Sequence, residues 1–153
     1  MKLSITAFLL TASLFACGAP QAQPATPASQ PAASGAAAQP EAALSRLTIE
    51  EVSARIAAHD GTQIFDNNSE QRYAQGHVPG ARHVSYDQLT AATLPADHGT
   101  PLVFYCGNEQ CQACHHAARQ AMSLGYHNVF IMPAGIMGWT QAGRPVVAGP
   151  NPS

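Results

Sequence analysis

The stretch 101–105 (Pro-Leu-Val-Phe-Tyr) constrains the fold more than any other part of this sequence, because after its proline it is apolar throughout without alternation. A strand with that pattern is buried on both faces, which is typical of a parallel sheet covered by helices. Two more short runs, 63–66 and 128–132, also indicate buried strands. The sequence therefore predicts an α/β fold with a central, mainly parallel sheet flanked by helices.

Helix signals separate these strands. Thr48 and Glu51 form a capping box, which predicts a helix that ends at Asp60-Gly61. Gly125 is placed to end a later helix as a left-handed cap. The remaining elements are expected as a short helix within 67–75, a strand at 82–84, a short helix at 85–89 capped by Ser85, and helices at 114–124 and 136–142.

The start of the chain indicates export. Residues 1–16 combine a positively charged start, at Lys2, with an apolar stretch of signal-peptide length. That stretch ends at Cys17, in a context that resembles a bacterial lipobox, where the cysteine becomes the lipidated N-terminus. The alternative is an ordinary secretory signal cut a few residues later, near Ala19 or Ala22. Either pattern predicts the cell envelope or periplasm, and lipidation of Cys17 would make the chain a membrane-anchored lipoprotein.

The segment that follows is not expected to fold. Residues 17–43 are rich in Ala, Pro and Gln and contain almost no large apolar side chain, so they cannot offset the entropy of ordering. We expect a disordered tether there, a folded domain over 44–149, and a tail at 150–153. The formal net charge is −2 and the few basic residues are scattered, so nucleic acid is not an expected partner.

Cys106 directly follows the 101–105 strand and precedes a polar loop and a helix. In an open parallel sheet, ligands bind beyond the carboxyl ends of the strands. Loop N–H groups and the start of the next helix favour a thiolate at such a place. The sequence thus predicts that Cys106 is a nucleophile with a lowered pKa; a buried structural cysteine is the alternative.

Three motifs recur at the spacing of a known family. They are Asp66 with the Gly-His-Val-Pro-Gly-Ala turn at 76–81, the Leu-Val-Phe-Tyr-Cys run at 102–106 followed by Cys114, Ala117 and Ala118 where a Ser-x-x-Ala-Ala helix start is usual, and the segment 129–139 followed by Gly-Arg-Pro-Val at 143–146. With these motifs, residues 64–146 resemble a single rhodanese domain, the fold of a family of sulfurtransferases.

The resemblance implies an activity of the thiosulfate:acceptor sulfurtransferase type. The sulfur-carrying cysteine of the family falls on Cys106, which would take sulfane sulfur from a small donor or a protein persulfide, hold it as a persulfide and pass it to a thiol acceptor. No cofactor or metal is implied. An anion cradle of loop N–H groups and a helix start suits a persulfide. The loop that would form it comprises Gly107, Asn108, Glu109, Gln110, Cys111 and Gln112.

Two positions and the loop after Cys106 depart from the family pattern. Asn68 stands where an arginine is usual, and Arg72 where a glutamate is usual, which predicts a rearranged ion pair. The loop holds Glu109 and no Arg or Lys. Because a negative charge opposes an anion such as thiosulfate, a protein persulfide or small thiol donor suits this loop as well. The loop is also about two residues longer than is usual, but the cysteine-plus-arginine signature of the family's phosphatase relatives is absent.

The loop region contains two further cysteines, Cys111 and Cys114. Either one could resolve an oxidised or persulfidated Cys106 as a disulfide, and Cys111-x-x-Cys114 is also the spacing of dithiol oxidoreductases. An envelope thiol redox protein is therefore the first alternative function. The simpler interpretation is that Cys114 merely replaces the usual serine.

The same residues allow two other readings. Cys111, Cys114 and His115 spell the C-x-x-C-H signature of covalent haem attachment, although a helix start that packs on a sheet leaves little room for haem. The three thiols with His115 and His116 could instead hold a soft metal, which gives a metal or sulfur carrier as the second alternative. The spacing matches no common structural zinc pattern, and no metal site is predicted.

Overall fold

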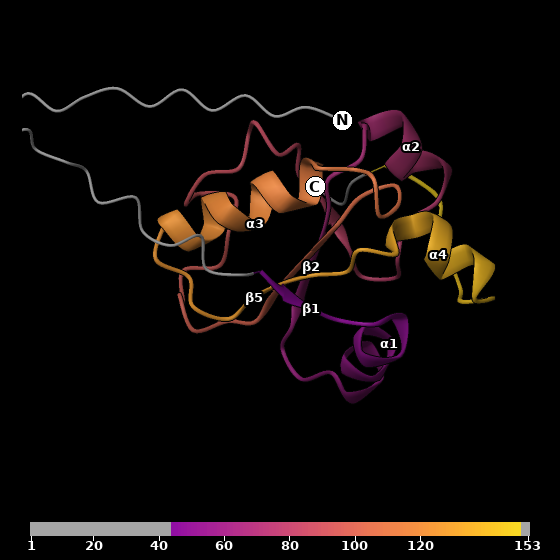
Figure 1. Cartoon of the computed structure of the whole chain (residues 1–153), viewed down its shortest axis with the longest axis horizontal. Helices are drawn as coiled ribbons and strands as arrows, with labels where there is room; N and C mark the ends of the chain where they lie inside the picture. Colours follow the sequence, from indigo (N-terminus) through magenta and orange to yellow (C-terminus); the bar gives the residue numbers. More distant parts are fainter. Residues whose placement is uncertain (1–43, 151–153) are drawn as a thin grey trace, which may run out of the picture. The chain divides into compact units, whose positions relative to one another are not determined.

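The structure is a computed structural model that describes residues 44–150, all within one compact unit. Its elements alternate between strands and helices along the chain (Figure 1). They are β1 (Ser45–Arg46), α1 (Ile49–Ala58), β2 (Gln63–Asp66), α2 (Glu70–Gln75), β3 (Arg82–His83), β4 (Leu102–Tyr105), α3 (Ala113–Ser123), β5 (Val129–Ile131) and α4 (Gly135–Gln141).

The strands form one five-stranded sheet in the order β1-β5-β4-β2-β3. Every strand pair in this sheet is parallel, with β4 at the centre between β2 and β5. Val103 of β4 is opposite both Ile64 and Phe130 in the register. The predicted α/β fold with a mainly parallel central sheet is confirmed.

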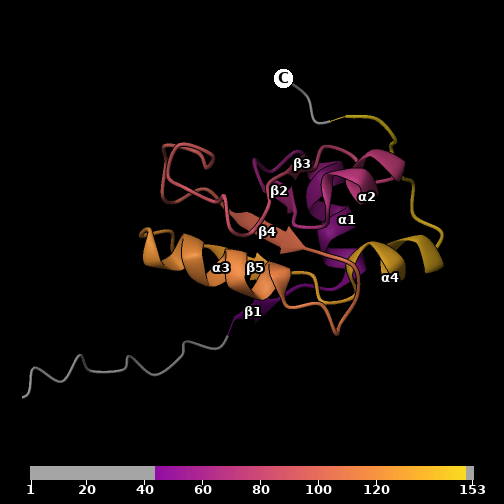
Figure 2. The ribbon, with the colours of Figure 1, turned by 90° about the horizontal axis from the view of Figure 1, so that it is seen from above.

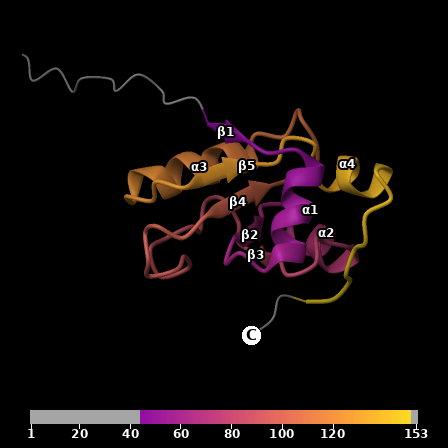
Figure 3. The same ribbon diagram turned by 90° about the horizontal axis from the view of Figure 1, so that it is seen from below.

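The central strand β4 is buried on both faces, as the absence of alternation predicted. Val103 and Tyr105 pack in a core with Val52 of α1 and Trp139 of α4. Leu102 and Phe104 point to the other face, where they pack against the alanines of α3. Figure 2 shows α3 in front of the sheet, and Figure 3, seen from the opposite side, shows α1 in front.

Helix α1 begins and ends where the sequence indicated. The Thr48 N–H donates to Glu51 Oε2 at 2.7 Å, and the Glu51 N–H donates to Thr48 Oγ1 at 3.2 Å, so the capping box is complete. The helix ends at His59, which adopts the left-handed conformation just before the Asp60-Gly61 stop.

Two features differ from the sequence-based expectation. The predicted short helix at 85–89 is wrong: this segment is a turn, in which the Gln88 N–H donates to the Ser85 carbonyl at 3.0 Å. The Ser85 hydroxyl bonds the Asp87 side chain rather than a backbone N–H, so it does not cap a helix. Strand β1 was not expected, because its two residues are polar and exposed and only its backbone pairs with β5.

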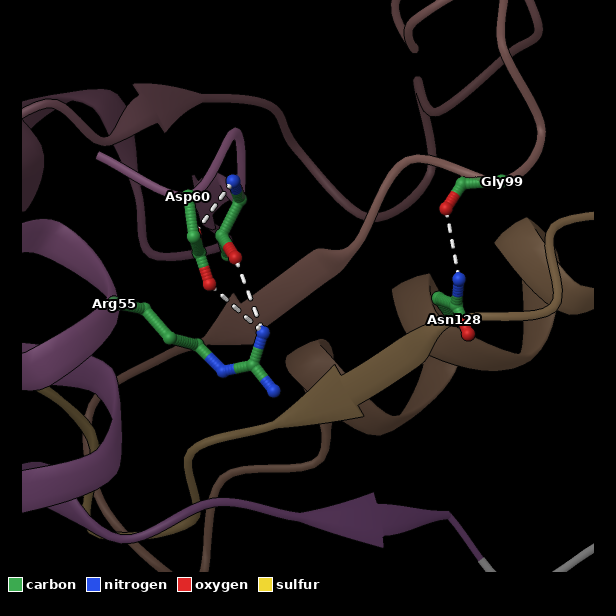
Figure 4. A network of polar contacts seen from close by, with 5 residues as sticks. Arg55, Asp60, Gly99 and Asn128 are labelled. Atoms are coloured by element: carbon green, nitrogen blue, oxygen red, sulfur yellow. Dashed lines mark hydrogen bonds and ion pairs between the residues drawn. The ribbon is translucent and has the colours of Figure 1, made fainter. Parts of the chain in front are cut away.

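Short polar contacts fasten the N-terminal edge of the sheet (Figure 4). Arg55 at the end of α1 donates to Asp60 at 3.2 Å and to Thr62 at 3.3 Å, just before β2 begins. Asn128, just before β5, donates to the Gly99 carbonyl at 2.7 Å. These contacts leave the opposite edge, where the strands end, to the loops that carry the candidate site.

The predictions for the chain ends concern residues that the structure does not describe. The signal peptide at 1–16, lipidation of Cys17, the tether at 17–43 and most of the tail at 150–153 fall outside 44–150. Within the described part, none of the helices is both long and apolar enough to cross a membrane.

Candidate functional site

Cys106 lies at the carboxyl end of the central strand, as predicted. It follows Tyr105, the last residue of β4, and its side chain is buried with 0% exposure. The loop 107–112 leads from it to the start of α3. The strand-loop-helix arrangement expected from the sequence therefore places the thiol beneath its own loop.

The start of α4 holds the main chain of Cys106 and Gly107. The Ile136 N–H donates to the Cys106 carbonyl at 2.9 Å, and the Met137 N–H donates to the Gly107 carbonyl at 3.0 Å. Gly135 lies so close that an added Cβ would be 2.5 Å from the Cys106 carbonyl oxygen. Gly135 belongs to the third family motif, the segment 129–139.

The loop itself is built around Asn108. The Asn108 side chain accepts from the Gln110 N–H at 3.1 Å, and its carbonyl accepts from the Cys111 N–H at 3.0 Å. Glu109 and Gln110 are exposed. Between this loop and α4 lies an open hollow of about 380 Å³, lined by Asn108, Glu109, Gln110, Ala134, Met137, Gly138 and Gln141.

All three thiols of the loop region are free, and two of them are in contact. The Cys106 thiol lies within hydrogen-bond reach of two acceptors, the Cys114 sulfur at 3.3 Å and the Cys111 carbonyl oxygen at 3.3 Å. Cys114 is 1% exposed and packs in the same core cluster as Cys106, whereas the Cys111 side chain is half-buried. Of the two predicted redox partners, Cys114 thus has its sulfur against Cys106.

The expectation of a lowered pKa for Cys106 is wrong in this arrangement. Hydrogen bonding to Cys114 and burial raise the pKa of the Cys106 thiol far above its usual value. Hydrogen bonding from Cys106 lowers the pKa of Cys114, at the start of α3. The two shifts share this main cause, because Cys106 is the donor of the contact and Cys114 is its acceptor.

A buried polar group supports the strand beneath Cys106. The Tyr105 hydroxyl donates to Asp66 Oδ2 at 2.6 Å and accepts from the Val78 N–H at 3.0 Å, which joins β4 to the first family motif. The other carboxylate oxygen of Asp66 accepts from both the backbone and side-chain N–H groups of Asn68 at 2.7 Å. Burial raises the pKa of Asp66 despite these bonds.

Arg72 supplies a positive charge that the loop sequence lacks. Its guanidinium lies over Gly107: a Cβ added there would be 2.8 Å from Arg72 Nη1 and 3.6 Å from Asn68 Oδ1. Sequence reasoning noted Arg72 only as a departure in an ion pair. The signal was a basic residue in place of an acidic one, but its approach to the residue after Cys106 is a tertiary contact.

The geometry of the site does not support the hypotheses of a soft-metal site or of covalent haem attachment. Within 44–150 no three His, Cys, Asp or Glu side chains are gathered so that they could hold a metal ion. Cys114, one half of the haem attachment pair, is buried against the sheet. Covalent haem there would require the packing of α3 to open.

Comparison with known proteins defines the class. The rhodanese-like domain family matches residues 48–142, and the chain belongs to that family. A relative from Pseudomonas paraeruginosa named "Thiosulfate sulfurtransferase GlpE" is 31% identical over 88 residues, which is 56% of this chain and 76% of the relative.

Solved structures share the fold. The BH2092 protein of Bacillus halodurans superposes with a TM-score of 0.63 at 20% identity, over 68% of this chain and 77% of that one. The single-domain sulfurtransferase RDL2 of Saccharomyces cerevisiae gives a TM-score of 0.57 at 21% identity, over 67% of this chain and 97% of that one. At this identity the likeness concerns the fold.

Proposed function

We propose that this chain is a sulfurtransferase that forms a persulfide on Cys106 and passes the sulfane sulfur to a thiol acceptor. The observation that carries the proposal is the position of Cys106: a free thiol at the carboxyl end of the central strand, below a loop clamped by α4. The relatives named as thiosulfate sulfurtransferases support the same chemistry.

The first half-reaction needs Cys106 as a thiolate, because the thiolate and not the thiol is the nucleophile. When the loop 107–112 moves aside, Cys106 gives its proton to solvent and attacks the outer sulfur of thiosulfate. The sulfur–sulfur bond of thiosulfate breaks and sulfite leaves with its electron pair. The products are a Cys106 persulfide anion, sulfite and one proton released to solvent, so charge and protons balance.

The charges around the loop determine which sulfur donors can approach Cys106. Arg72 over Gly107 attracts an anion, whereas Glu109 on the exposed part of the loop repels one. A thiosulfate-type anion and a persulfide on a small thiol or protein both fit this balance. Cys106 is buried, so the donor reaches it only when the loop 107–112 moves aside.

The test of this function is a single turnover under anaerobic conditions. The reduced chain is mixed with thiosulfate and the sulfite released is measured, with Cys106→Ser as the control. We expect a burst of one sulfite per chain that is absent in Cys106→Ser. A wild-type chain that releases neither sulfite from thiosulfate nor glutathione from a glutathione persulfide donor, or a burst from Cys106→Ser equal to that of the wild type, would refute the proposal.

We also propose that the protein works in the cell envelope, anchored by lipid on Cys17. The apolar stretch of 1–16 and the lipobox-like context of Cys17 support this location. Fractionation of the expressing bacterium tests it: wild-type chain should sediment with membranes and Cys17→Ser should be soluble. Membrane attachment that survives Cys17→Ser would contradict lipid anchoring.

A further inference from the structure

Cys114 is a second thiol in direct contact with the sulfur carrier. Its sulfur lies 3.3 Å from Cys106 Sγ, and both side chains are closed off from solvent by the same core. Forming a sulfur–sulfur bond of about 2.05 Å would require the two atoms to approach by only about 1.2 Å more. Cys111 is the other thiol beside Cys106, and its carbonyl oxygen accepts from the Cys106 thiol at 3.3 Å.

The place of Cys114 in the fold makes it a usable nucleophile. It is the second residue of α3, where backbone N–H groups without helical partners favour a thiolate. Nothing on the α3 side separates it from Cys106, so its nearest electrophile after sulfur loading is the inner sulfur, Cys106 Sγ. An acceptor from solution, by contrast, has to displace the loop 107–112 to reach the persulfide.

We propose that Cys114 resolves the persulfide on Cys106, which makes the protein a hydrosulfide-releasing persulfide reductase; this rests on the persulfide function proposed above. Cys114 Sγ attacks Cys106 Sγ, and the Cys114 proton passes to the outer sulfur. The persulfide bond breaks, hydrosulfide leaves with its electron pair, and a Cys106–Cys114 disulfide forms. The sulfane sulfur is thereby reduced by two electrons and the two thiols are oxidised by two.

The cycle is completed by an external dithiol of the thioredoxin class, which reduces the disulfide and is itself oxidised. Without that reductant the protein stops after one turnover. Cys111 takes no part in the bond change and remains a free thiol. The activity that follows is the conversion of sulfane sulfur to hydrosulfide at the expense of a dithiol, which competes with transfer of the sulfur to a thiol acceptor.

The test uses the full chain in a Cys17→Ser background, so that the loop thiols are the only cysteines. Chain freed of reductant is mixed anaerobically with thiosulfate, and sulfite, hydrosulfide and intact mass are followed. We expect hydrosulfide equal to sulfite, and a product two hydrogens lighter with one alkylatable thiol. Cys114→Ser, which restores the residue usual in the family, should release sulfite and gain one sulfur atom. Its hydrosulfide release should be slower than that of the wild type by about 100-fold or more.

Cys111→Ser is the matched control, since it removes the other nearby thiol, and its hydrosulfide release should persist. The proposal would be overturned if the wild-type chain kept the added sulfur, if hydrosulfide release persisted in Cys114→Ser, or if it were lost in Cys111→Ser. In each of these cases a sulfite burst would still support the sulfurtransferase function. Absence of sulfite from every variant would refute both.

Discussion

A Cβ atom on Gly135 would lie 2.5 Å from the carbonyl oxygen of Cys106. Gly135 has a φ of +60°, a conformation that L-residues with a side chain rarely adopt. The next residue, Ile136, donates its N–H to that same carbonyl at 2.9 Å. The start of α4 therefore holds the main chain of the nucleophile through an approach that only glycine permits.

Gly135→Ala should displace α4 from the loop and slow sulfur loading. The positive φ alone costs about 1–2 kcal/mol, and the clash adds a shift of the Cys106 carbonyl. Gly143→Ala is the matched control, because it also has a positive φ (+67°) but meets nothing within 4 Å. We expect both variants to lose stability in urea, and only Gly135→Ala to lose most of the sulfite burst. Equal bursts from the two variants would contradict the clamping role.

Much of the fold could be predicted because its strands are short apolar runs and its first helix has a complete capping box. Strand β1 escaped prediction, since Ser45 and Arg46 join the sheet edge through backbone pairing alone. The helix predicted at 85–89 was wrong because a local signal was present but is not used for a helix. Ser85 is a good cap residue, but in this chain its hydroxyl is taken by a side chain.

Cys114→Ser should make the Cys106 thiol easier to ionise. Hydrogen bonding to Cys114 is the largest cause that raises the pKa of Cys106, and burial is the next. The substitution removes this sulfur acceptor, so the pKa of Cys106 should fall towards its usual value. Iodoacetamide labelling of Cys106 across pH, followed by peptide mapping, measures this. A Cys106 labelling midpoint that stays or rises would show that burial, not Cys114, controls the thiol.

Tyr105→Phe should destabilise the protein more at neutral than at mildly acidic pH. The change leaves Asp66 and the Val78 N–H short of a partner, at a cost of about 1.5–3 kcal/mol. Burial already raises the pKa of Asp66 and the Tyr105 bond opposes that rise, so the variant should raise this pKa further.

The sign of this pH effect follows from proton binding. Folded Asp66 holds its proton to a higher pH than the unfolded chain does, so its contribution is fully present below the usual pKa of 3.8 and is lost as pH rises through the folded value. In Tyr105→Phe this loss extends to higher pH. Urea unfolding at neutral and mildly acidic pH checks it, and an equal deficit at both would show that Asp66 does not feel the tyrosine hydroxyl.

The candidate site was harder to predict than the fold. Position along the chain identified Cys106 and its loop, because a cysteine after a buried parallel strand lies at the edge where ligands bind. The direction of its pKa shift was missed, since that depends on a hydrogen bond to Cys114 and on burial, both of which are tertiary features. The approach of Arg72 to Gly107 depends on how α2 packs, which no local pattern encodes.

Glu109→Gln should improve the use of an anionic donor. Glu109 is exposed on the loop that covers Cys106, and its charge opposes the approach of thiosulfate. We expect kcat/KM for thiosulfate to rise about twofold to fivefold at low salt, and the gain to fade as salt screens the charge. An unchanged or lower kcat/KM would show that Glu109 lies outside the donor's path.

Arg72→Gln should have the opposite effect, because it removes the guanidinium that lies over Gly107. Within residues 44–150 no carboxylate forms an ion pair with Arg72, so the charge of Arg72 remains available to an approaching anion.

Two alkylating reagents of similar size isolate the electrostatic effect of Arg72: iodoacetate carries a negative charge and iodoacetamide carries none. We expect the rate of iodoacetate divided by the rate of iodoacetamide at Cys106 to fall about threefold to tenfold in Arg72→Gln. Arg55→Gln makes the same change of net charge at the opposite edge of the sheet and should leave the ratio near that of the wild type. If both reagents slow equally in Arg72→Gln, the guanidinium supports the shape of the loop rather than attracting the donor.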